Sequence, residues 1–231
     1  MTVAITSSPT NITIDTTAID ANTLDRIRQI YSQPLPDLMF EAQRIHREHH
    51  DPRAIQLCTL GNIKSGACPE DCGYCSQSVH NSSGLAPEPL MQSAAVLQEA
   101  QAAKASGSTR FCMGAAWREV KDGPQFDRVL DMVRDVAALD MEVCCTLGML
   151  KPHQAQQLKE AGLTAYNHNL DTSPSYYEKV ITSRTYNAAT THRNPRIADG
   201  LDRVEPILVG TAGNHFFVIA GGRVQVVIVS R

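Results

Sequence analysis

The sequence has no long apolar run and no excess of positive charge. Its longest apolar stretches, residues 216–220 and 224–229, are far shorter than the ~18 residues that span a bilayer, so we expect no membrane span. The 21 Lys and Arg residues are offset by 24 Asp and Glu residues, for a formal net charge of -3, which predicts no affinity for nucleic acid. Hydrophobic residues make up 42% and charged residues 19%, which argues against a disordered or collagen-like chain.

The N-terminal segment also lacks the features of a secretory signal. Residues 1–20 have neither a basic start nor a continuous apolar core, and they show no sustained periodicity. We therefore predict a flexible leader over residues 1–22 and a cytoplasmic protein. The seven cysteines are an odd number, and cytosolic thiols are normally kept reduced, so the sequence favours metal binding over a disulfide framework.

Strand-like and helix-like patterns alternate along most of the chain. Apolar spacings of three and four predict two helices between residues 23 and 49, separated near Pro34 and Pro36. Strands are then expected at residues 55–60, 109–117, 141–146 and 163–169, and helices at residues 90–106, 126–136, 152–161 and, beginning near Ser173, 173–181. This alternation implies a parallel sheet, and we expect an α/β fold: a partial TIM-type (βα) barrel over residues 23–187. In such barrels the chemistry lies at the C-terminal ends of the strands.

Three cysteines lie close together on a loop after the first of these strands. Cys68, Cys72 and Cys75 form a C-x3-C-x2-C pattern in a stretch rich in Gly, Pro and Asp. Structural zinc sites use four ligands, and His80 is the available fourth ligand here. An iron–sulfur cubane held by three thiolates instead leaves one iron open to an exogenous ligand. The spacing favours the cluster over zinc.

The spacing resembles the signature of the radical S-adenosylmethionine enzymes, with Tyr74 in the customary aromatic position before the last cysteine. The neighbouring segments extend the likeness, in order and at compatible separations: GACPEDCGYCSQS, GSTRFCMGAAW, CTLGML, YNHNLDTSPSYY and ITSRTY. Together they resemble the biotin synthase family over residues 24–186.

The resemblance implies a barrel enzyme that converts dethiobiotin to biotin with two iron–sulfur clusters. In this family Cys68, Cys72 and Cys75 would hold a [4Fe-4S] cluster whose open iron binds S-adenosylmethionine. Reductive cleavage of that cofactor would release methionine and a 5'-deoxyadenosyl radical that abstracts hydrogen from the substrate. Cys112 and Cys144 match two ligands of a [2Fe-2S] cluster that resembles a sacrificial sulfur donor. From the residues alone, packing on a buried strand is the more ordinary role for these two cysteines.

Cys144 is followed directly by Cys145, which the resemblance leaves as a bystander. Side chains on a strand alternate between its two faces, so the two cysteines are expected to point in opposite directions. By its position in the EVCCTLG segment, Cys144 is the one that faces the interior of the barrel.

The resemblance also assigns a pocket to the ends of the predicted strands. The expected cofactor-binding residues are Tyr74, Gly114, Ala115, Asn169 and Asp171. Asn167 and Asn169 would contact the substrate, since amides can pair with a ureido group and a carboxylate can accept from ribose hydroxyls. The alternatives are that Asn and Asp cap the helix expected near Ser173, and that the small-residue turn only relieves crowding.

The last part of the sequence departs from the family pattern. The family continues with strand–helix units that carry a third cysteine and a distal arginine ligand of the second cluster, whereas no cysteine follows Cys145 here. Residues 188–231 contain five Arg and no Lys in Gly-punctuated β-like runs, as in an out-of-frame gene end. We interpret them as a divergent, poorly ordered tail in place of the C-terminal portion of the barrel. Either this tail pairs with the open sheet edge, or the product is an inactive fragment.

Other interpretations of the motifs are weaker. Lipoyl synthase carries an additional N-terminal cysteine triad, but only Cys58 precedes Cys68 here. A non-enzymatic module that binds zinc or a cluster is the alternative from a different class. His46, His49 and His50 lie at a polar helix end and are assigned no role. The partners implied by the resemblance are dethiobiotin, a flavodoxin-type electron donor and, in full-length relatives, a second subunit of a homodimer.

Overall fold

The computed structural model describes residues 21–169 and 171–191 and the backbone of the strand residues 204–205, 209–212, 215–220 and 223–229. The chain divides into two compact units, Met1–Pro52 and Arg53–Arg231. All seven cysteines belong to the second unit. Residues 1–20 of the predicted leader lie outside the described residues.

In the first unit the two helices expected between residues 23 and 49 are α1 (Ala21–Tyr31) and α2 (Leu35–His49). Helix α2 starts with Pro36 in its first turn, where the missing amide would have had no intrahelical partner. At its other end the amide of His50 donates to the carbonyl of His46 at 2.8 Å. The predicted break between the two helices is confirmed.

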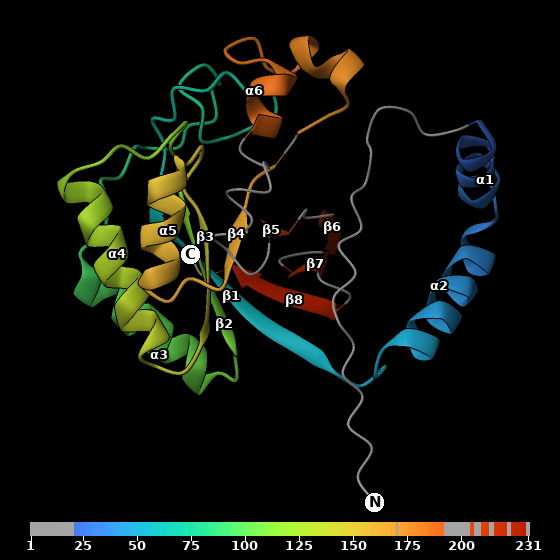
Figure 1. The fold of residues 1–231 in the computed structure, drawn as a ribbon, viewed down its shortest axis with the longest axis horizontal. Helices are drawn as coiled ribbons and strands as arrows, with labels where there is room; N and C mark the ends of the chain where they lie inside the picture. The colour runs from blue at the N-terminus through green and yellow to red at the C-terminus, as the bar shows by residue number, and fades with distance from the viewer. Residues whose placement is uncertain are drawn as a thin grey trace, which may run out of the picture. The chain divides into compact units, whose positions relative to one another are not determined.

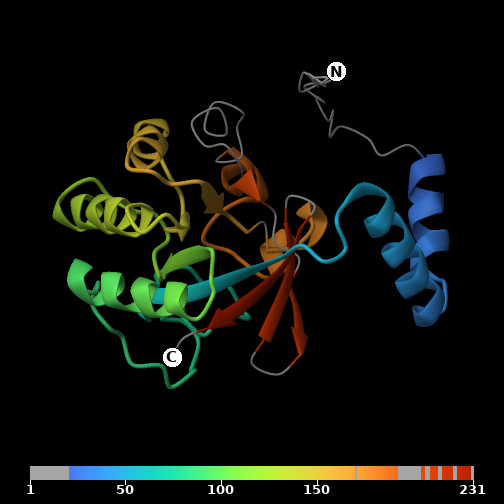
Figure 2. The ribbon, with the colours of Figure 1, turned by 90° about the horizontal axis from the view of Figure 1, so that it is seen from below.

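The second unit is built on parallel strands joined by helices. Its strands are β1 (Ile55–Lys64), β2 (Arg110–Ala115), β3 (Glu142–Thr146) and β4 (Ala165–Asn167). The connecting helices are α3 (Ser93–Ala105), α4 (Pro124–Ala137) and α5 (Pro152–Glu160). The strands are parallel and stand side by side in chain order, with the three helices together on one side of them (Figures 1 and 2). Because this is the arrangement of a (βα) barrel, the predicted α/β partial barrel is confirmed.

The core lies between the sheet and these helices. Strand residues that face the helices are buried there, namely Ile63, Phe111, Met113, Val143 and Cys145. Helix α4 contributes an apolar stripe at helical spacing, which includes Val129, Val133 and Val136. Full burial of each large apolar side chain contributes roughly 1.5–3 kcal/mol to folding, so this face holds the unit together.

Strands from the predicted tail extend the sheet at both edges. Strand β5 (Val204–Glu205) is parallel to β4, and β8 (Arg223–Val229) is parallel to β1, beside which Figure 1 shows it. Strands β7 (His215–Ala220) and β6 (Val209–Ala212) follow β8 in antiparallel pairing. The edge of β1 that faces away from β2 is therefore paired.

The helix expected over residues 173–181 is a 3-10 helix, η1 (Pro174–Lys179), and a short α-helix, α6 (Tyr186–Thr191), follows it. In η1 the amide of Tyr176 donates to the carbonyl of Ser173 three residues earlier, at 3.1 Å. No helix in the described part of the chain is long and apolar enough to cross a membrane.

Candidate functional site

The C-terminal ends of β1 to β4 surround an open hollow of about 190 Å³. The predicted site residues that line it are Cys68, Cys72, Tyr74, Cys75, Ala115, Asn169 and Asp171. Glu70, Arg118 and Arg184 also line it, although the sequence analysis did not single them out. Residues from four strand ends thus converge on one place, as expected for a (βα) barrel.

The cysteine loop that follows β1 is held in shape by hydrogen bonds to its own backbone, from one amide of the loop and from a side chain. The amide of Cys68 donates to the carbonyl of Gln77 at 2.9 Å. The side-chain amide of Asn81 donates to the carbonyls of Cys72 and Cys75, at 2.8 and 2.9 Å. These contacts fix where the three thiols emerge without using the thiols themselves.

The three thiols line one hollow, as the ligands of an iron–sulfur cluster would. Burial raises the pKa of Cys72 to about 12, so this thiol is neutral at pH 7 unless a metal stabilises its thiolate. No three His, Cys, Asp or Glu side chains of the described residues are arranged to hold one metal ion, and His80 Nε2 lies 3.3 Å from the carbonyl oxygen of Pro69. Three thiolates around one hollow fit an iron–sulfur cluster, which spreads its ligands over several iron atoms. The zinc alternative with His80 gains no support.

Cys112 and Cys144 lie opposite each other on neighbouring strands. The parallel register of β2 and β3 pairs them directly, on the face away from the helices. Cys144 is buried there, whereas Cys145 belongs to the core between sheet and helices, so the predicted alternation is confirmed. Two residues earlier on the same strands, Arg110 Nη2 lies 2.6 Å from Glu142 Oε2.

Only one residue of the predicted small-residue turn reaches the hollow. Ala115 lines it, and Gly114 does not. A Cβ atom at Gly114 would come no closer than 3.5 Å to Asn62 Oδ1, which is an ordinary contact. Packing therefore gives no reason for a glycine at this position.

The predicted substrate residues separate at the end of β4. Asn167 is the last residue of β4 and is buried outside the hollow, whereas Asn169 is exposed and lines it. His168 between them is also buried. The structure brings Asn169, but not Asn167, together with the cysteine loop.

Asp171 has the left-handed backbone φ of 65° and a side chain that is only 5% exposed. Its Oδ2 accepts from Arg184 Nη2 at 2.7 Å, and its Oδ1 accepts from the hydroxyl of Tyr74. Burial and this hydrogen bond raise the pKa of Tyr74, so the hydroxyl stays protonated and donates. The N-cap of η1 is Ser173, whose side chain makes no capping hydrogen bond to the helix backbone, so the alternative of Asp171 as the cap of this helix is wrong.

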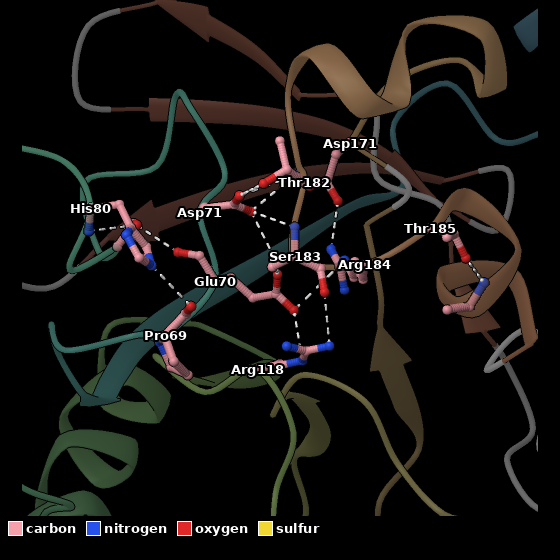
Figure 3. A network of polar contacts seen from close by, with 12 residues as sticks. Pro69, Glu70, Asp71, His80, Arg118, Asp171, Thr182, Ser183, Arg184 and Thr185 are labelled. Carbon is pink, nitrogen blue, oxygen red and sulfur yellow. Dashed lines mark hydrogen bonds and ion pairs between the residues drawn. The ribbon is translucent and has the colours of Figure 1, made fainter.

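Two acidic residues between the first two cysteines bind a distant segment, as Figure 3 shows. Asp71 accepts from the amides of Thr182 and Ser183, each at 3.1 Å, and from both of their hydroxyls. Glu70 accepts from the Ser183 hydroxyl and lies 3.3 Å from Arg118 Nε. Burial alone would raise the pKa of Asp71, but the hydrogen bonds from Thr182 and Ser183 outweigh it and hold that pKa below its usual range.

This acidic–basic network was missed by the sequence analysis. A signal for it was present, because the acids lie inside the cysteine motif and the base and hydroxyls lie inside the ITSRTY segment. Buried carboxylates need a cation or several donors, so two such motifs in one chain are candidates for direct contact.

Comparison with known proteins assigns the chain. The family model described as the Radical SAM superfamily matches residues 62–200, which include the cysteine loop, Asp171 and Arg184. The chain belongs to the radical SAM superfamily.

Three similar curated proteins are biotin synthases by name. This radical SAM chain is 67% identical over 193 residues to the biotin synthase of Gloeobacter violaceus, covering 83% of the chain and 56% of that protein. It is 60% identical over 165 residues to the biotin synthase of Methylobacterium sp., covering 71% and 50%. For that of Cytophaga hutchinsonii the identity is 58% over 164 residues, covering 71% and 49%. The chain spans about half the length of the curated relatives it matches.

Solved structures show the same fold at low sequence identity. Methylornithine synthase (PylB) superposes with a TM-score of 0.65 at 14% identity, over 78% of this chain and 53% of that one. The [FeFe]-hydrogenase maturase HydG superposes with a TM-score of 0.61 at 18% identity, over 76% and 40%. At such identities the likeness shows the fold alone.

Proposed function

We propose that this radical SAM chain carries the cofactor-cleaving core of a biotin synthase, which inserts sulfur into dethiobiotin. The observation that carries the proposal is that Cys68, Cys72, Cys75 and Asp171 line one hollow at the ends of parallel strands. The similarity to proteins named biotin synthase supports the choice of this reaction within the superfamily.

Each residue of the hollow has a proposed task. Cys68, Cys72 and Cys75 would hold a [4Fe-4S] cluster, which when bound supplies the electron that cleaves S-adenosylmethionine. Asp171 would accept hydrogen bonds from the ribose hydroxyls of that cofactor, for which a carboxylate has acceptor capacity beyond its two present partners.

The remaining lining residues would complete the cofactor and substrate contacts. The small side chain of Ala115 leaves room beside the cysteine loop for the methionyl end of the cofactor. Tyr74 would cover the ribose from the loop side, and exposed Asn169 would pair with the ureido group of dethiobiotin.

Sulfur donation is proposed for the neighbouring pair Cys112 and Cys144, which would hold a [2Fe-2S] cluster. The two residues are paired directly on adjacent strands, whose backbones lie roughly 5 Å apart, so the two thiols are close enough to share one cluster.

A second candidate function is cleavage of S-adenosylmethionine without formation of biotin. The observation behind it is that β2 and β3 bring two thiols, Cys112 and Cys144, to the face away from the helices, whereas the cysteine loop brings three to the hollow.

The proposal is tested by anaerobic reconstitution of the 231-residue chain with iron and sulfide, followed by reduction and electron paramagnetic resonance. We expect a reduced [4Fe-4S] signal that changes when S-adenosylmethionine is added. Separate assays of 5'-deoxyadenosine and of biotin then distinguish cofactor cleavage alone from the full reaction.

Cysteine variants decide which thiols matter. We expect Cys72→Ala to lose the signal and all cleavage of S-adenosylmethionine, because a cluster ligand is removed. Cys145→Ala is the matched control, since its thiol lies in the core on the other side of the sheet, and it should keep both. Normal cleavage by Cys72→Ala would contradict the proposal.

The proposed partners and compartment follow the same assignment. A flavodoxin-type protein would supply the electron, a second copy would form a homodimer in full-length relatives, and the chain would act in the cytoplasm. Pull-down with reduced and oxidised flavodoxin and sedimentation of the reconstituted chain are the direct measurements.

A further inference from the structure

Arg184 lies buried between two carboxylates that come from different parts of the site. Its side chain is 8% exposed, its Nη2 lies 2.7 Å from Asp171 Oδ2, and its Nε lies 3.9 Å from Glu70 Oε1. The two carboxylate side chains are 5% and 6% exposed. A buried carboxylate without a cationic partner is strongly unfavourable, so this guanidinium stabilises Asp171 by a direct hydrogen bond and attracts Glu70 more weakly, without a hydrogen bond.

The contact with Asp171 fixes an orientation as well as a charge. A left-handed φ of 65° is uncommon for a residue other than glycine, and Asp is one of the residue types that adopt it more readily. Tyr74 and Arg184 bind different oxygens of the carboxylate, one from the cysteine loop and one from the other side (Figure 3 shows the contact with Arg184). The plane of the carboxylate is thereby set.

The segment that precedes Arg184 is anchored to the cysteine loop. The residues before it, Thr182 and Ser183, are bound by Asp71 through four hydrogen-bonding groups, and the amide of Gly73 donates to the carbonyl of Val180 at 3.0 Å. These hydrogen bonds therefore fix the position of the segment that carries Arg184 relative to the cysteine loop.

Glu70 does not by itself explain why an arginine is needed. Arg118 Nε already lies closer to Glu70, at 3.3 Å, than Arg184 does. The 2.7 Å ion pair with Asp171 is shorter than the 3.9 Å ion pair of Arg184 with Glu70. The principal partner of Arg184 is therefore the carboxylate of Asp171, which lines the hollow.

We propose that Arg184 is a positioning residue, which together with the Tyr74 hydroxyl holds the Asp171 carboxylate in the orientation that accepts the ribose hydroxyls of S-adenosylmethionine. This inference rests on the proposed function, because that function assigns the ribose to Asp171. Arg184 acts through Asp171, so the loss of either residue should affect the same part of the ligand.

The test compares two ligands on the reconstituted, unreduced full chain, where no turnover occurs. The ligands are S-adenosylmethionine and its 2',3'-dideoxyribose analogue, and equilibrium dialysis measures both dissociation constants. We expect the wild type to prefer the hydroxylated ligand by about tenfold, the value of a charge-assisted hydrogen bond, and Arg184→Met to lose most of this preference. Asp171→Asn should lose it too, and the double variant should lose no more than either single one.

Controls separate positioning from general damage. Iron content and affinity for the dideoxy analogue should stay at wild-type values in Arg184→Met. Arg134→Met removes an exposed arginine that pairs with Asp131 on α4, and it should change neither ligand. Arg184→Lys, which keeps the charge but not the planar fork, should restore part of the preference.

The outcomes distinguish the two proposals. An Arg184→Met variant with the full wild-type preference overturns the role of Arg184 and leaves the proposed function standing. A wild-type chain that binds neither ligand, or that shows no preference, overturns the proposed function and this inference with it. If Arg184→Met does not fold, Arg184→Lys decides: a reduced preference supports the positioning role, and an unchanged one overturns it.

Discussion

Lys64, the last residue of β1, joins two segments on which the hollow depends. Its Nζ donates to the carbonyl of Gly66 at 2.8 Å, where the cysteine loop begins, and to the carbonyl of Ala116 at 3.1 Å, just after β2. Both carbonyls belong to buried residues. Burial lowers the pKa of Lys64, because removing the ammonium from water disfavours its charged form. The hydrogen bonds to the two carbonyls offset part of this desolvation.

We expect Lys64→Met to lower the free energy of unfolding by about 1–3 kcal/mol, because two buried carbonyls lose their donor. Urea denaturation of the chain without iron measures this directly. Lys151→Met is the control, since that side chain is 62% exposed and 3.9 Å from Asp122, and it should change stability by less than about 0.5 kcal/mol. Equal losses in the two variants would show that the carbonyl contacts of Lys64 contribute nothing special.

Sequence patterns identified single residues only where the residue type itself implies chemistry. The three loop cysteines and Asp171 could be nominated in this way, and the structure brings them to one hollow. Arg184 and Lys64 could not, because their partners are remote in sequence or are backbone carbonyls, which no side-chain pattern reveals. Asn167 was predicted from its amide at the end of a strand, but it lies outside the hollow.

At the level of elements, the order of strands and helices followed from apolar periodicity, whereas their ends did not. Strand β1 continues to Lys64 instead of ending at Leu60, because Gly61 and Asn62 still pair with β2 although they break the apolar pattern. Helix α3 begins at Ser93 and not at Leu90. The amide of Met91 donates instead to the carbonyl of Ile63 on β1, which keeps this stretch out of the helix.

The exit of β3 passes close to the backbone of Arg118. Gly148 has φ +75°, and a Cβ atom there would lie 2.4 Å from the carbonyl oxygen of Arg118. Only glycine avoids this overlap. The close approach lies beside Arg118, whose side chain lines the hollow.

We expect Gly148→Ala to destabilise the chain by about 2 kcal/mol or more, from the left-handed φ and the backbone overlap together. Gly84→Ala is the matched control, because Gly84 has φ +72° and no atom within 4 Å of the added Cβ, so it isolates the conformational part of about 1 kcal/mol. Thermal unfolding of both variants gives the comparison. The same loss in both would mean that the backbone of Arg118 yields freely to the methyl group.

At the scale of the whole molecule, the sheet is completed by strands from beyond the motif-bearing region. The order β5-β4-β3-β2-β1-β8-β7-β6 places β8 between β1 and β7. Six residue pairs, from Ile55 with Val224 to Leu60 with Val229, join β8 to β1. Pairing of these β-like runs with an open sheet edge is one of the two alternatives that the sequence predicts, and β8 pairs with β1 in this way. The apolar pattern did not give the register, because register depends on the strand that the runs meet.

Proline within β8 tests this pairing. Since β8 has a neighbouring strand on each edge, the amide of Val226 faces one of them, and Val226→Pro removes a ladder hydrogen bond and leaves a carbonyl without its donor. We expect Val226→Pro to lower the free energy of unfolding by about 1–3 kcal/mol more than Val226→Ala, which keeps the amide and serves as the control. Circular dichroism during urea unfolding measures the difference, and size-exclusion chromatography reports association through the freed edge of β1. Identical unfolding curves for the two variants would mean that the Val226 amide makes no ladder hydrogen bond to either neighbour, which would contradict the placement of β8 between β1 and β7.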